Sequence, residues 1–139
     1  WRDRLQRQGL KNVTLTGFVA NQRLPLYQAA ADLLLMPYQR TITGSSGGDS
    51  AAYASPMKMF EYMASQRPIL SSDLPVVREV LHARNAVLCP PDDLPAWSRA
   101  LAGLLADASW RQSLAQQAWQ EVQVYTWEQR ARRALEGLP

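Results

Sequence analysis

Short apolar runs alternate along the chain with segments in which apolar residues recur every three or four positions. The short runs lie at residues 13–16, 33–36, 68–71 and 86–89, and their length is typical of strands. The periodic segments predict helices, at residues 3–10, 21–31, 55–65, 74–81, 94–106, 109–122 and from Trp127 onward. Strands that alternate with helices in this way predict an α/β fold with a parallel sheet.

The second apolar run, residues 33–36, is uninterrupted and ends at Pro37. A run of this kind between helices predicts a central strand that is buried on both faces. A long polar segment with three glycines follows it, at residues 38–55. Loops of this length are uncommon in compact domains and tend to serve a function.

The 139 residues are 47% hydrophobic and 19% charged, which indicates one globular domain over residues 1–139. The net charge is only +3, and the arginines are scattered except for Arg130, Arg132 and Arg133. Because binding to nucleic acid usually needs a concentrated basic face, we expect no nucleic-acid partner.

The single cysteine, Cys89, excludes an internal disulfide and indicates a reducing compartment, so we expect a cytoplasmic protein. No apolar stretch approaches the length that crosses a bilayer, and the sequence does not say whether the parent protein touches a membrane. The chain begins at Trp1 rather than at a methionine, so we expect a fragment of a longer protein. We also expect His82 at the surface and Asp73 as the cap of the helix after it.

The glycine-containing loop runs directly into the predicted helix at residues 55–65, with Ser55 as N-cap and Pro56 in the first turn. The first N–H groups of a helix have no partners within it, and the helix dipole adds positive charge there. Glycine lets a phosphate approach the backbone closely. The junction is therefore a candidate anion site.

Lys58 and Glu61 lie three residues apart near the start of the same helix. They could form a surface ion pair, which contributes a few tenths of a kcal/mol. Alternatively, Lys58 faces a phosphate and Glu61 accepts two hydrogen bonds from a ribose diol, one on each carboxylate oxygen. The spacing alone leaves both interpretations open.

Several ordered segments resemble glycosyltransferase family 4. Four of them surround the candidate site, at residues 55–64 (SPMKMFEYMA), 67–69 (RPI), 72–75 (SDLP) and 78–80 (REV). Others lie before and after it, at residues 13–19, 31–37, 85–91 and 125–127. The resemblance implies the C-terminal, donor-binding half of a GT-B enzyme, with a partial Rossmann-like parallel sheet, flanking helices and its first strand–helix units missing.

The resemblance also implies a role for residues at matching positions. Glu61 would bind the ribose of a UDP- or GDP-linked sugar donor, which is a substrate rather than a cofactor. The amides of Met57 and Lys58, which follow Pro56, would face the diphosphate. The family transfers sugar with retention of configuration and without a metal bound by a protein motif, because the helix dipole and basic side chains stabilise the leaving diphosphate.

Gly17 and Phe18 lie where the family forms part of its base pocket. The family often carries two glutamates, the second at Glu61 and the first at the position of Tyr53. Because Tyr53 is not an acid, the role of that first glutamate does not transfer, and no catalytic residue is assigned. Tyr53 either binds ligand or packs the loop.

Two strand–helix units and the acceptor domain precede this part of the chain in the family. In the strand order 3-2-1-4-5-6, a gap then separates strand 13–16 from strand 32–36. We expect an incomplete sheet, or a homodimer that completes it, and a fragment that is inactive alone. The alternatives are a non-catalytic nucleotide-binding or assembly module with a GT-B fold, and a sugar-nucleotide epimerase.

Overall fold

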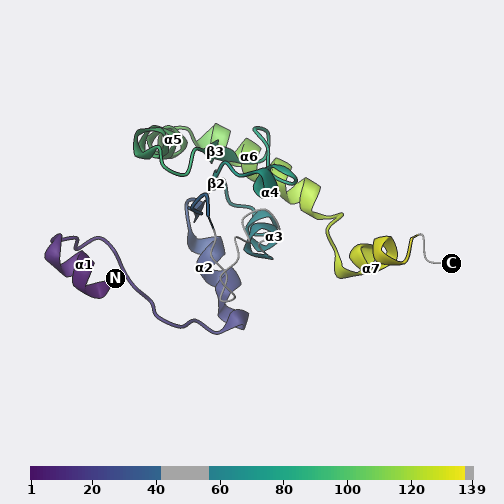
Figure 1. The fold of residues 1–139 in the computed structure, drawn as a ribbon, viewed down its shortest axis with the longest axis horizontal. Helices are drawn as coiled ribbons and strands as arrows, with labels where there is room; N and C mark the ends of the chain where they lie inside the picture. The colour runs from purple at the N-terminus through teal and green to yellow at the C-terminus, as the bar shows by residue number, and fades with distance from the viewer. Residues whose placement is uncertain (42–56, 137–139) are drawn as a thin grey trace.

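The computed structural model describes residues 1–41 and 57–136. Three parallel strands form one sheet in the order β1 (Leu34–Met36), β2 (Ile69–Ser72) and β3 (Val87–Cys89). A 3-10 turn at Asn21–Arg23 and seven α-helices complete the described part, namely α1 (Arg2–Arg7), α2 (Leu24–Ala30), α3 (Met57–Ala64), α4 (Pro75–Arg78), α5 (Leu94–Ala106), α6 (Ala108–Val122) and α7 (Trp127–Leu135). The predicted α/β fold with a parallel sheet is confirmed, and α1 and α7 lie on opposite sides of the layered centre (Figure 1).

Helices cover both faces of the sheet, and α6 contributes to both. On one face, Met36 and Ile69 pack with Met59 and Met63 of α3 and with Ala118 of α6, within a larger buried cluster. On the other face, the cluster consists of Leu70 and Cys89 from the strands and Leu104 and Leu114 from α5 and α6. The sheet is therefore the middle layer of three, as expected for a parallel sheet with crossover helices.

The prediction that residues 33–36 are buried on both faces is wrong for Leu35. Leu34 and Met36 are buried, but the Leu35 side chain is 44% exposed. Leu35 is in register with Leu70, on the face that α5 covers. Because β1 lies at the edge of the described sheet and α5 packs over β3, this side of β1 stays uncovered.

The prediction of a strand at residues 13–16 is also wrong. This segment has no regular structure, and Val13 and Leu15 are 45% and 41% exposed. A strand exists only when a neighbour pairs with its backbone, and no described strand pairs with this segment or with the free edge of β1. The observed order β1-β2-β3 agrees with the last three strands of the predicted arrangement, and completion of the sheet by a second copy stays a prediction.

The helices of the C-terminal half follow the sequence closely because aspartate or threonine side chains cap them. The Asp93 carboxylate accepts from the Ala96 amide at 2.9 Å, and the Asp107 carboxylate accepts from the Trp110 amide at 2.8 Å. Thr126 caps α7 in the same way.

Helix α4 is shorter than the predicted range of residues 74–81, and the predicted cap does not form. The carboxylate of Asp73 pairs with the Arg78 guanidinium, at 2.7 Å for Nη2, instead of accepting from the backbone. The hydrogen bond from Arg78 holds the pKa of Asp73 below its usual range; burial opposes this effect, and the charge of Arg78 adds to it.

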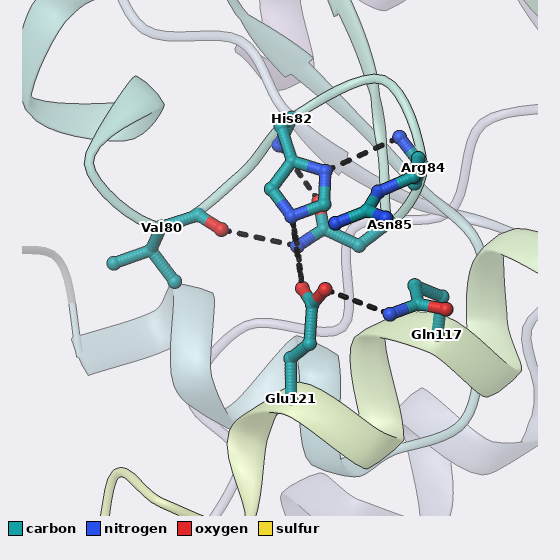
Figure 2. Close-up of polar contacts among 6 residues, drawn as sticks. All are labelled: Val80, His82, Arg84, Asn85, Gln117 and Glu121. Atoms are coloured by element: carbon teal, nitrogen blue, oxygen red, sulfur yellow. Dashed lines mark hydrogen bonds and ion pairs between the residues drawn. The ribbon is translucent and has the colours of Figure 1, made fainter.

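A polar network around Asn85 fastens the turn before β3 to helix α6 (Figure 2). The Asn85 side chain is fully buried, and its amide nitrogen donates to the Val80 carbonyl at 3.0 Å and to the Glu121 carboxylate at 2.5 Å. Its amide oxygen accepts from the backbone N–H of His82 at 2.8 Å. The Asn85 side chain thus forms hydrogen bonds both with the turn before β3 and with α6.

His82 is partly buried rather than simply at the surface, with 41% of its side chain exposed. Its Nδ1 accepts from the Arg84 amide at 3.3 Å, which leaves Nε2 to donate to the Glu121 carboxylate at 3.1 Å. Burial raises the pKa of Glu121, but the hydrogen bonds from Gln117 and Asn85, together with His82, outweigh it, so the net pKa lies below the usual value.

Replacing the buried amide should weaken the fold. We expect Asn85→Leu to lower the free energy of unfolding by about 3 kcal/mol, because it leaves the Val80 carbonyl without its donor and the His82 amide without its acceptor, and removes one of the donors to Glu121. Arg84→Ala, at the exposed neighbouring position, should change it by less than about 0.5 kcal/mol. Urea unfolding measures both, and equal stability of the two variants would contradict this role.

The turn that follows helix α3 holds one residue in a strained conformation. Gln66 has φ of +56°, the left-handed region in which a β-carbon collides with the following carbonyl oxygen. Glycine carries no such penalty and is the usual residue at this position after a helix.

We therefore expect Gln66→Gly to raise the free energy of unfolding by about 1 kcal/mol. Gln66→Ala is the matched control, because it removes the same side-chain atoms but keeps the β-carbon. Thermal or urea unfolding of the two variants gives the comparison. An alanine variant as stable as the glycine variant would show that the backbone conformation is not the cause.

Candidate functional site

The segments that follow the three strands are tied together at the carboxyl edge of the sheet. The Ser72 hydroxyl donates to the Tyr38 carbonyl at 2.6 Å, and the Asp73 amide donates to the Cys89 carbonyl at 2.8 Å. In open α/β sheets, ligands bind at this edge. These two hydrogen bonds therefore stabilise the edge of the sheet at which the sequence predicts a site.

Helix α3 presents the predicted residues to solvent because its opposite face is buried. Met59 and Met63 are fully buried, whereas Met57, Lys58 and Glu61 are exposed. The structure records no ion pair between Lys58 and Glu61, so the first of the two interpretations of this pair is not observed. The Lys58 ammonium instead lies over the ring of Tyr38, 5.9 Å from its centroid, within the range of a cation–π contact.

A cavity of about 420 Å³ opens between the first turns of α3 and the segment that includes α7. Its size falls within the range of sites for small molecules. Glu61, Arg130 and Arg133 contribute its charged groups, and the remaining lining residues are Met57, Phe60, Val124, Tyr125, Thr126 and Trp127.

Aromatic rings shape one part of this cavity. The rings of Phe60 and Tyr125 lie 5.0 Å apart at an angle of 43°, and the Arg130 guanidinium lies 5.6 Å from the centroid of the Trp127 ring. Flat apolar surfaces next to guanidinium groups and one carboxylate suit a ligand that combines a planar ring, an anion and hydroxyl groups.

Two phenols near the site remain neutral at pH 7. Burial raises the pKa of Tyr38. Burial also raises the pKa of Tyr62, and the charges of Tyr38 and Glu61 add to that rise. Both phenols therefore keep their O–H groups as hydrogen-bond donors.

The structure brings only part of the predicted set together. Glu61 and Met57 line the cavity, and Lys58 lies beside them over Tyr38. Pro56 and Tyr53, like most of the predicted loop, lie outside the described residues.

Gly17 and Phe18 lie in the irregular segment between α1 and the 3-10 turn, and neither lines the cavity. Gly17 has φ of +71°, which favours glycine, and the Phe18 side chain is 94% exposed. Their role in a base pocket stays a prediction.

The contribution of α7 was not predicted. From the sequence, the arginines were weighed only as a surface for nucleic acid, and Trp127 was assigned no role in a site. The spacing of these residues could have indicated a shared site, because Trp127, Arg130 and Arg133 recur every three residues and so share one face of a helix.

None of the helices within residues 1–41 and 57–136 is long and apolar enough to cross a membrane. The same residues contain no group of three or more histidine, cysteine, aspartate or glutamate side chains that could hold a metal ion.

Comparison with solved structures shows the same fold in two other proteins. Sucrose-phosphate synthase from Thermosynechococcus elongatus superposes with a TM-score of 0.79 over 97% of this chain and 32% of its own length, at 23% sequence identity. Anabaena HepE in complex with UDP and glucose gives a TM-score of 0.73 over 99% of this chain and 35% of its own, at 22% identity. The complex of HepE with UDP-glucose gives 0.75 over 99% and 36%, at 21% identity.

The chain thus spans about a third of the length of each of these structures. No curated protein sequence matches it significantly. A family model described as glycosyl transferases group 1 matches residues 1–107, which is well over half of the chain. This match, together with the parallel sheet and its flanking helices, shows that the chain belongs to the group 1 glycosyl transferases.

Proposed function

We propose that this chain is the nucleotide-sugar-binding half of a GT-B glycosyltransferase of family 4. In the longer protein, it would hold a UDP- or GDP-linked donor while a separate N-terminal domain holds the acceptor. The sugar would then be transferred with retention of configuration. The family match and the UDP and UDP-glucose complexes of HepE support this assignment.

One observation carries the proposal for the site. The exposed carboxylate of Glu61 lines a cavity at the start of α3, near the carboxyl edge of a parallel sheet. A ribose in that cavity would offer two neighbouring hydroxyls, and a carboxylate can accept one hydrogen bond on each oxygen. Glu61 is therefore assigned to the ribose.

The same geometry suggests a role for the amides at the start of α3 and for two arginines. The amides of Met57 and Lys58 are at the positive end of α3, and a diphosphate there would gain from both the N–H groups and the dipole. Arg130 and Arg133 line the cavity and add positive charge. As the bond to the sugar breaks, these fixed groups would stabilise the charge that develops on the leaving diphosphate.

A titration of this chain with UDP, GDP and ADP tests the proposal. We expect one nucleotide to bind selectively, and Glu61→Ala to weaken it at least about tenfold, because two hydrogen bonds to a charged group are lost. Ligand-observed NMR measures both affinities. Glu79→Ala is the matched control, since Glu79 is exposed and does not line the cavity.

Equal affinity of the Glu61 and Glu79 variants would contradict the assigned role of Glu61. If the chain binds none of the three nucleotides, the same titration on the longer protein shows whether the site is incomplete in this chain or the proposal is wrong. No binding by the longer protein rules the proposal out. Nucleotide binding by the longer protein without sugar transfer would favour the non-catalytic module instead.

A further inference from the structure

A second cavity, of about 490 Å³, opens at the amino ends of β1 and β2. Asp32 precedes β1, and Gln66, Arg67 and Pro68 precede β2. This cavity shares no lining residue with the one at Glu61. The two lie at opposite ends of α3, whose eight residues span about 12 Å.

One face of α6 forms the opposite wall of this second cavity. Its lining residues on α6 are spaced three or four positions apart, as expected for a single helix face, at Ala108, Arg111, Gln112, Ala115, Gln116 and Trp119. The wall therefore combines a guanidinium, two carboxamides and an indole ring. These groups are not packed away, since Gln112 and Gln116 are exposed and the Trp119 side chain is 40% exposed.

Two arginines of the cavity are half-buried without a carboxylate partner among the described residues. The Arg67 guanidinium donates to the Ala29 carbonyl at the end of α2. The Arg111 guanidinium donates to the carbonyls of Leu104 at 2.5 Å and Leu105 at 2.8 Å, at the end of α5. Carbonyl groups position the guanidiniums but do not neutralise them, so both positive charges can attract an anion in the cavity.

The Arg111 side chain keeps N–H groups for a ligand. Both of its recorded bonds use Nη1, whereas a guanidinium carries five N–H donors. An anion with several oxygens, such as a phosphate or a carboxylate, is the partner that this fork fits best.

The other groups extend the recognition beyond a bare anion. The Trp119 ring offers a flat apolar surface, and the Gln112 and Gln116 carboxamides can donate to or accept from hydroxyls, whereas the Asp32 carboxylate can accept from them. A sugar ring has one apolar face and a rim of hydroxyls. We propose that this cavity is a second ligand site that binds a small sugar carrying a phosphate or carboxylate group.

The strain at Gln66 agrees with this assignment. Gln66 keeps a side chain at φ of +56°, where glycine would be more stable, and it lines the cavity. Strained backbone residues gather at ligand sites. The proposal itself rests on the two arginines and the indole, and it does not depend on the function of the cavity at Glu61.

The test is a titration of the isotope-labelled chain with glucose 6-phosphate, glucuronate, glucose and inorganic phosphate, followed by two-dimensional NMR. We expect an anionic sugar to shift the amide signals of Arg67 and Arg111 and the indole signal of Trp119. Glucose and phosphate should bind at least about tenfold more weakly, because each offers only part of the recognised chemistry. Comparing glucose 6-phosphate with glucuronate shows whether a phosphate or a carboxylate is preferred.

Matched variants distinguish binding in this cavity from binding elsewhere on the chain. Arg67→Gln should weaken binding at least about tenfold. Gln112→Glu should do the same by adding a negative charge while leaving the Arg111 bonds to α5 intact. Arg99→Gln, on α5 outside the cavity, should leave the affinity unchanged.

Three results would overturn the proposal: no shift at the three reporter residues, unchanged binding by Gln112→Glu, or inorganic phosphate binding as tightly as glucose 6-phosphate. Signals of Met57, Phe60 and Glu61 report on the other cavity. A failure of either site is therefore distinguishable from a failure of the other.

Discussion

The architecture depends on complete burial of strand β2. Ile69, Leu70, Ser71 and Ser72 are each at most 1% exposed, so both faces of this strand must be covered. Ile69 packs with α3 and α6 on one side, and Leu70 packs with α5 on the other. The two serines would be costly to bury alone, and they are satisfied by carbonyls of the strand and segment next to them, at Met36 and Tyr38.

The burial of β2 also determines the position of the candidate site. The Ser72 hydroxyl fixes the segment after β1 through the Tyr38 carbonyl, and the ring of Tyr38 lies under the Lys58 ammonium. Helix α3 is held on its methionine side by the core, which leaves Glu61 facing outward. A polar residue at the end of a buried strand thus connects core packing to the position of the first turns of α3.

Elements with a strong local signal were predictable from the sequence. Helices α5 and α6 appear where the periodicity of apolar residues places them, and strands β2 and β3 appear where short apolar runs occur between helices. The wrong predictions have one cause: the type of a residue does not show which other segment of the fold packs against it. Val13 and Leu15 have the composition of a strand but no partner, and Leu35 has the composition of a core residue but no covering helix.

The candidate site was predictable only in its α3 half. The loop–helix junction and the family resemblance indicate Glu61, Lys58 and Met57, because these lie within one continuous motif at residues 55–64. The aromatic and basic wall from α7 comes from about 65 residues later in the chain, and only tertiary structure brings Arg130 and Arg133 to the same cavity. Both cavities are lined by residues of α3 and α6 or of the segments that follow these helices, and α3 and α6 pack against each other.

A crystal structure of this chain soaked with UDP tests the central claim most directly. The account predicts the nucleotide in the cavity at the start of α3, with the ribose hydroxyls on the Glu61 carboxylate and the diphosphate at the amides of Met57 and Lys58. A nucleotide bound elsewhere on the chain, with Glu61 facing empty solvent, would contradict it.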